Sequence, residues 1–147
     1  TNTMHKVAGR IEKAISIPFL HIADATGQKI VGTGMGKVGL LGTAFTMEQA
    51  FYTDRLVAAG LQPLVPGLED RAETHRIIYQ ELCRDEVIPE SEAAYRGIAA
   101  RLVDAGADCL ILGCTEVGML LNAGNVAVPV FDTTLIHCEA ALHRSLQ

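Results

Sequence analysis

Apolar and polar residues alternate along this chain with two different periods. Short apolar runs bounded by glycine or proline predict buried strands, and apolar residues three or four positions apart predict amphipathic helices. The expected strands are residues 16–21, 37–42, 61–65, 108–112 and 128–131. The expected helices are residues 1–15, 22–31, 47–59, 70–84, 90–105, 115–121 and 132–146. This alternation is typical of an α/β fold with a parallel sheet.

One stretch joins a buried strand to a cysteine. Residues 108–112 are mostly Leu, Ile or Cys, and Gly113 ends the strand. Cys114 then begins a helix at the carboxyl end of that strand, where open α/β sheets bind their ligands. A helix N-terminus offers unpaired N–H groups and a positive dipole, so we expect the pKa of the Cys114 thiol to be lowered. The alternative is that Cys114 is an inert, buried apolar residue.

Small hydroxyl and amide side chains recur where other strands end or helices begin. They occur in residues 1–3, 43–46 and 132–134, and again at Thr115. Such groups beside helix N-termini suit the binding of a carboxylate. Helix caps use the same residue types, and Asp132 is well suited to cap the last helix. Their recurrence beside a thiol favours a functional site.

The composition is that of a folded globular protein, with 49% apolar and 20% charged residues. The sequence has seventeen acidic and twelve basic residues, so we expect neither a nucleic-acid nor a membrane partner. No apolar run reaches membrane-spanning length, and no signal-peptide pattern is present. The four cysteines form no CxxC pair, so we expect free thiols in the cytoplasm.

Other motifs carry little weight. Residues 32–37 spell G-x-G-x-G-K, which is one residue short of a phosphate loop and precedes a strand instead of following one. No histidine stands four residues from another histidine or a cysteine within a helix, so no metal is expected. The sequence contains no Gly-x-Ser-x-Gly motif, so a serine hydrolase is not expected.

The motifs resemble the aspartate/glutamate racemase family, whose members invert amino acids without pyridoxal phosphate. Residues 1–7 are similar to the segment directly after that family's first catalytic cysteine, and residues 113–116 are similar to the segment that holds the second. Residues 41–43, 46–48 and 129–133 match further family segments in the same order. The resemblance is strongest to its bacterial aspartate-racemase-like, broad-specificity branch.

The resemblance implies a flavodoxin-like parallel sheet and, in the whole protein, two pseudo-symmetric lobes. Residues 1–34 would be a remnant of the first lobe, residues 35–121 the second lobe, and residues 122–147 a return to the first. The first catalytic cysteine would stand directly before Thr1, so the chain would be the carboxyl-terminal part of a longer racemase. We therefore expect the 147 residues alone to be inactive. The whole protein is expected to be a homodimer.

The resemblance also implies how the site works. Two cysteines face each other across the substrate's α-carbon, one as base and one as acid, with no cofactor. Cys114 is the second of them. The substrate, aspartate, glutamate or a broader set of amino acids, would be held by Asn2, Thr3, Thr46 and Thr115. Two residues would support the site, namely Thr1 and Glu116, the latter by orienting Cys114 or tuning its charge.

Two alternatives stay open. Another two-cysteine enzyme of the superfamily, such as a hydantoin racemase or a maleate isomerase, would share the thiol geometry. A non-catalytic domain could instead bind a carboxylate or an amino acid at the same helix N-termini, with Cys114 inert. Cys83, Cys109 and Cys138 are poor substitutes for the first catalytic thiol, because the patterns put Cys109 within a strand and the others on helices.

Overall fold

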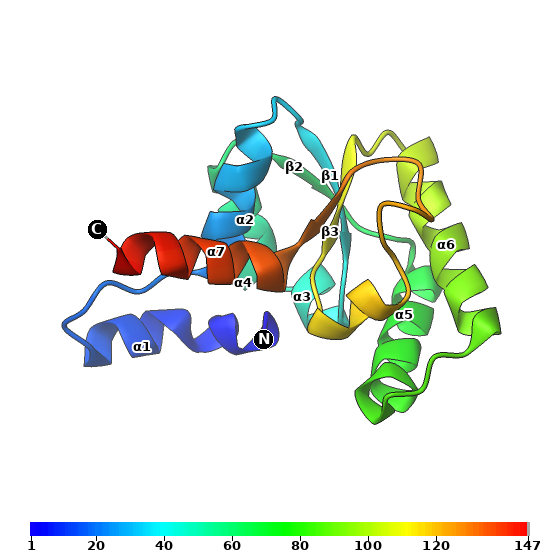
Figure 1. Ribbon diagram of the computed structural model, residues 1–147, viewed down its shortest axis with the longest axis horizontal. Helices are drawn as coiled ribbons and strands as arrows, with labels where there is room; N and C mark the ends of the chain where they lie inside the picture. Colours follow the sequence, from blue (N-terminus) through cyan, green and yellow to red (C-terminus); the bar gives the residue numbers. More distant parts are fainter. Residues whose placement is uncertain (147) are drawn as a thin grey trace.

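The computed structural model describes residues 1–146, which form one four-stranded sheet. The strands are β1 (Lys37–Leu41), β2 (Gln62–Leu64), β3 (Cys109–Leu112) and β4 (Val130–Asp132). Their order is β2-β1-β3-β4, and all three neighbouring pairs are parallel. Flavodoxin-like sheets begin with this order. The expected α/β, flavodoxin-like fold is therefore confirmed (Figure 1).

Helices cover both faces of the sheet (Figure 1). One face carries α2 (Ile22–Val31), α4 (Ala50–Ala58) and α7 (Thr133–Ser145), and the other carries α5 (Leu68–Gln80) and α6 (Pro89–Asp104). The shorter elements are α1 (Ala8–Ala14), α3 (Ala44–Glu48) and the 3-10 helices η1 (Thr3–Val7), η2 (Leu82–Arg84) and η3 (Thr115–Met119).

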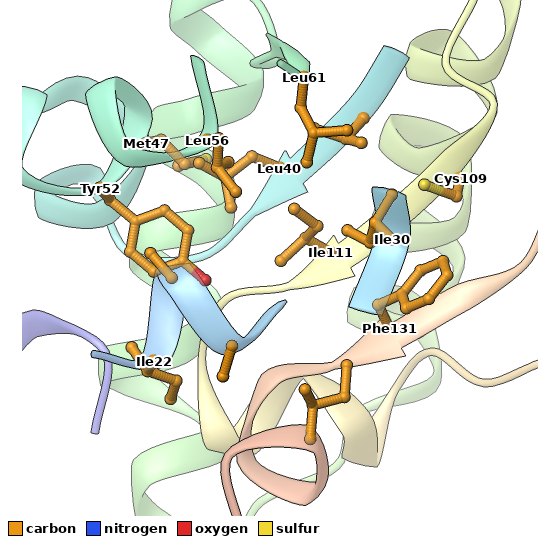
Figure 2. Packing of buried hydrophobic residues seen from close by; sticks show 14 residues of the cluster. Ile22, Ile30, Leu40, Met47, Tyr52, Leu56, Leu61, Cys109, Ile111 and Phe131 are labelled. Atoms are coloured by element: carbon orange, nitrogen blue, oxygen red, sulfur yellow. The ribbon is translucent and has the colours of Figure 1, made fainter. Parts of the chain in front are cut away.

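The core has two parts because successive strand residues point to opposite faces of a sheet. Leu40 and Ile111 pack toward α2, α4 and α7, and Figure 2 shows them with Tyr52 and Leu56 from α4. Leu41 and its neighbours pack toward α5 and α6 on the other face. Burial of these apolar side chains fixes the register of the sheet and with it the positions of the loops at its carboxyl edge.

Most predicted elements are present with shifted ends. The predicted helix at residues 1–15 divides into η1 and α1, and the one at 47–59 divides at Gln49, whose ψ of 140° is extended. Asp132 caps α7 as predicted, because its Oδ1 atom accepts hydrogen bonds from the amides of Thr134 (2.8 Å) and Leu135 (3.1 Å).

The predicted strand at residues 16–21 is wrong. These residues form an irregular connection between α1 and α2. Pro18 has no N–H to donate, and Ile17 is 70% exposed instead of facing a core. The carbonyl of Leu20, which a strand would use in a ladder, instead accepts a hydrogen bond from His137 Nε2 at 3.0 Å.

The division into residues 1–34, 35–121 and 122–147 stays a prediction. Within the described chain, β4 pairs with β3, and α7 packs on α2. None of the helices in residues 1–146 combines the length and the apolar character needed to cross a membrane.

The connections from the strands diverge between β1 and β3. The chain leaves β1 toward β2 on one side, whereas β3 adds on the other side and continues to β4. In open α/β sheets ligands bind outside the carboxyl ends of the strands at such a switch point. The segments that begin there are α3 after β1 and η3 after β3.

Candidate functional site

Two glycines bring the ends of β1 and β3 into direct contact. The amide of Gly113 donates to the carbonyl of Leu41 at 2.6 Å. A Cβ atom on Gly113 would lie 2.9 Å from that same oxygen, and one on Gly42 would lie 3.0 Å from the oxygen of Gly113. Only glycine fits this approach without a shift of the backbone. The residues that follow, Thr43 and Cys114, therefore begin their loops side by side.

Three threonine hydroxyls form a chain on the β1 side of the switch point. Thr43 Oγ1 lies 3.4 Å from both Thr3 Oγ1 and Thr46 Oγ1, and we call these residues the hydroxyl chain. Thr46 is fully buried at its inner end, against the position that a side chain on Gly113 would take. Thr3 is half-buried at the outer end. Thr46 therefore lies behind Thr43. Thr43 was not among the substrate-binding residues predicted from the sequence.

On the β3 side, a thiol is paired with a carboxylate. Cys114 Sγ donates a hydrogen bond to Glu116 Oε2 at 2.9 Å, and both residues are half-buried. Burial, with the hydrogen bond to Glu116 and its charge, raises the pKa of Cys114 to about 12. The predicted lowering of this pKa is wrong, because burial and the neighbouring carboxylate both oppose the thiolate. The free site thus holds a protonated thiol.

Asn2 connects the start of the chain to α7. Its Nδ2 atom donates to Thr133 Oγ1 at 2.9 Å, and that hydroxyl donates to the carbonyl of Leu112 at 2.8 Å. Asn2 is only 3% exposed, and its Oδ1 atom has no hydrogen-bond partner among the described residues. A buried acceptor without a partner costs free energy, so this oxygen suits a donor on a ligand.

The other two predicted residues lie nearer the surface. Thr115 is exposed, and its hydroxyl accepts a hydrogen bond from Thr134 Oγ1 at 3.5 Å. Thr1 is exposed, and its carbonyl lies 3.1 Å from His5 Nδ1. Contacts therefore connect Thr3 and Thr46 to the loop after β1, and they connect Asn2 and Thr115 to the start of α7. They leave Thr1 with a contact to His5, which is not one of the predicted site residues.

Helix α5 and η2 add residues that the sequence did not single out. His75 Nδ1 accepts a hydrogen bond from the amide of Ala44 at 3.1 Å and so holds the first residue of α3. Cys83 lies in η2, which packs against η3, and burial together with the charge of Glu116 raises the pKa of its thiol. The available signal was a four-residue repeat, because His75, Tyr79 and Cys83 share one side of the predicted helix at 70–84.

The remaining cysteines lie away from this arrangement. Cys109 is fully buried in β3, where burial raises the pKa of its thiol to about 11. Cys138 is exposed on α7, and all four cysteines are free. Within residues 1–146, no three or more His, Cys, Asp or Glu side chains are placed to hold a metal ion.

Comparisons with known proteins identify the family of this chain. The Asp/Glu/Hydantoin racemase family model matches residues 1–141. A crystal structure described as that of a putative Asp/Glu racemase from Yersinia pestis has 49% sequence identity to this chain and a TM-score of 0.96. The match covers all of this chain and 64% of the Yersinia pestis chain. The crystal structure of an aspartate racemase homologue from Pyrococcus horikoshii OT3 has 34% sequence identity and a TM-score of 0.89. The match covers 100% of this chain and 65% of the Pyrococcus horikoshii chain.

A curated relative points the same way. The broad-specificity amino-acid racemase RacX of Bacillus subtilis is 24% identical over 133 residues, which are 90% of this chain and 57% of that protein. The chain belongs to the Asp/Glu/Hydantoin racemase family. It spans 64% and 65% of the lengths of the two solved structures.

Proposed function

We propose that this chain is part of an amino-acid racemase that needs no cofactor. The observation that carries the proposal is the Cys114–Glu116 pair at the switch point between β1 and β3, beside the hydroxyl chain. Family membership supports a racemase, and the neighbouring polar groups supply what an amino acid requires. The activity, the substrate and the oligomeric state of the whole protein are all part of this proposal, and we expect a homodimer.

The substrate's carboxylate would bind at the hydroxyl chain. Threonine hydroxyls can each donate one hydrogen bond, and in the free site they share theirs weakly, at 3.4 Å. Rotation of these hydroxyls toward a carboxylate would exchange weak bonds for charge-assisted ones.

The substrate's ammonium group would bind Asn2. The buried Oδ1 atom of Asn2 has no partner among the described residues, while its Nδ2 atom is held by Thr133. An ammonium has three donors and fits an acceptor fixed in this way. Thr115, on the other side of the β3 loop, would complete the contacts to the substrate.

Cys114 would exchange a proton with the α-carbon. In the free site its thiol is protonated, which suits the acid step, in which the S–H proton moves to the carbanion and leaves a thiolate. In the reverse direction the thiolate takes the α-proton, and a substrate ammonium nearby favours that charged form. Glu116 would orient the S–H bond. The second thiol, on the opposite face, would be the cysteine that the family resemblance implies directly before Thr1.

Exchange of the α-proton in D₂O tests the proposal. The polypeptide encoded by its gene is incubated with L- and D-amino acids, and deuterium at the α-carbon is followed by NMR. We expect Cys114→Ala to lose exchange by more than about 10³-fold, because general acid–base catalysis contributes on the order of 10²–10⁴. Cys138→Ala, which removes an exposed thiol from α7, is the matched control and should leave exchange unchanged.

Each alternative predicts its own result. Exchange in a hydantoin but in no amino acid would indicate another two-cysteine enzyme. Amino-acid binding that is unchanged in Cys114→Ala, with no exchange by the parent protein, would indicate a binding domain. We expect a polypeptide restricted to residues 1–147 to show no turnover, since one of the two bases would be missing.

A further inference from the structure

Three aromatic rings lie together beside the candidate site. The ring centroids of His75 and Tyr79 are 4.7 Å apart, and those of Phe45 and His75 are 6.1 Å apart. Phe45 is 40% exposed and Tyr79 is 45% exposed, so both present a ring edge or face to the outside. We call Phe45, His75 and Tyr79 the aromatic group.

The aromatic group is attached directly to the substrate-binding loop. Phe45 precedes Thr46 of the hydroxyl chain in α3, and His75 accepts the amide hydrogen of Ala44 at 3.1 Å. That bond requires an imidazole with its proton on Nε2. Because His75 is held by α3 and contacts a ring on either side, the two exposed rings have a defined position relative to the hydroxyl chain.

Beyond the end of α5 at Gln80, the chain leads to a second thiol, that of Cys83. Cys83 follows Tyr79 by four residues and lies in η2, which packs against η3. Burial and the charge of Glu116 raise the pKa of the Cys83 thiol. The aromatic group therefore lies beside the hydroxyl chain, and the segment that follows α5 packs against the element that carries Glu116.

Charge near this border disfavours an acidic side chain on the substrate. Arg71 donates to Glu48 Oε1 and to the carbonyl of Pro66, both at 3.0 Å. Arg76 donates at 2.7–2.8 Å to Glu73 and Glu81, so both arginines of α5 are already paired with carboxylates. A second carboxylate on the substrate would need a cation, and Glu116 would repel it.

We propose that the aromatic group receives the side chain of the substrate and selects amino acids with apolar or aromatic side chains. This inference rests on the proposed racemase function and names its substrate class. Exposed rings in a fixed position bind an apolar side chain by removing their own surface from water. The alternative is that Arg84, which is exposed in η2 next to Cys83, binds the substrate's side chain, and this residue would favour an acidic substrate.

The test compares binding and exchange for six amino acids, namely alanine, leucine, methionine, phenylalanine, aspartate and glutamate. Affinity is measured by saturation-transfer NMR and exchange by deuterium incorporation, both with the polypeptide encoded by its gene. We expect phenylalanine and methionine to bind at least about tenfold more tightly than aspartate. Phe45→Ala and Tyr79→Ala should each weaken phenylalanine binding about tenfold, because one apolar contact accounts for 10- to 200-fold discrimination.

Matched variants separate the aromatic group from general damage. Alanine, which has only a methyl group, should bind the parent and both variants within about twofold, and Tyr79→Phe should keep the preference. Leu68→Ala removes an exposed apolar side chain from the first residue of α5 and should change nothing. Arg84→Ala should likewise leave phenylalanine binding unchanged.

Two results would overturn the inference. One is tightest binding of aspartate or glutamate, lost in Arg84→Ala, and the other is phenylalanine binding that falls no further in Tyr79→Ala than in Leu68→Ala. Selective binding of apolar amino acids without any α-proton exchange would contradict the racemase function while supporting the aromatic group. Exchange of the α-proton in acidic amino acids alone would support the racemase function and contradict the role of the aromatic group.

Discussion

The loops after β1 and β3 begin alike and then carry different chemistry. Each starts with a glycine, and Gly42 and Gly113 approach each other so closely that a Cβ atom on either would meet the other strand's end. The β1 loop continues with neutral hydroxyls that bond weakly to one another. The β3 loop continues with a thiol donating to a carboxylate at 2.9 Å.

The difference shows how one backbone arrangement can divide binding from proton transfer. Hydroxyls keep their state over the whole physiological pH range, so the β1 loop can hold a carboxylate without titrating. The thiol beside Glu116 changes its proton affinity with every nearby charge. Three substitutions test this division, in order of decreasing expected effect.

Gly113→Ala should disturb both loops together. The new Cβ atom would lie 2.9 Å from the carbonyl oxygen of Leu41, which is backbone and cannot turn away. We expect a loss of about 3 kcal/mol in the free energy of unfolding, the upper end for overpacked sites, measured by urea denaturation. Gly36→Ala is the control, since nothing lies within 4 Å of its added Cβ atom, and it should change stability by less than about 0.5 kcal/mol. Equal effects would show that the two loops are not in tight contact.

Glu116→Gln should affect the β3 loop alone. The pKa of Cys114 is raised to about 12, so the thiolate fraction of the parent should keep rising about tenfold per pH unit from pH 7 to 10. Removing the carboxylate charge lowers the pKa, and we expect alkylation of Cys114 by iodoacetamide to be about tenfold faster at each pH, as for a shift of one unit. Site-resolved mass spectrometry measures it.

The control for this experiment is Glu90→Gln, which removes an exposed carboxylate at the start of α6. It should leave the alkylation rate of Cys114 unchanged. If Glu116→Gln slowed the reaction or left it unaltered, the charge of the carboxylate would not contribute to the raised pKa of Cys114.

Thr46→Val should have the smallest effect and act on the β1 loop. Valine keeps the shape that packs against Gly113 and removes the hydroxyl at the inner end of the hydroxyl chain. We expect KM for an amino-acid substrate to rise about fivefold with little change in kcat, since a hydrogen bond contributes about 1 kcal/mol. Thr46→Ser keeps the hydroxyl and should restore KM. A fall in kcat alone would argue against a binding function for Thr46.

Local patterns predicted the central strands of the sheet because β1 and β3 are buried on both faces. The apolar runs that became β1 and β3 are bounded by glycines, and burial requires them to pair. The predicted strand at residues 16–21 has a similar apolar content but lacks a partner, and Pro18 interrupts its donors. Pairing is a property of the whole fold, so a short apolar run does not reveal it.

The sequence predicted which residues form the candidate site better than it predicted their pKa values. The strand-end position of Cys114 followed from Gly113, whereas its raised pKa depends on how deeply η3 buries it and where Glu116 turns. Neither the depth of burial nor the direction of the Glu116 side chain can be read from a short helical pattern. Residues brought in by α5, such as His75, depend on packing between distant elements and leave only a weak repeat in the sequence.

The hydrogen bond from Asn2 to Thr133 joins residues 131 positions apart. On a ribosome that adds about 5–20 residues each second, Asn2 would wait on the order of ten seconds for its partner to be made. The sheet between β1 and β3 can form during that interval, but the ammonium-binding end of the proposed site cannot. A nascent chain would therefore form the centre of its sheet before its site, and it could not act on a substrate until synthesis had passed α7.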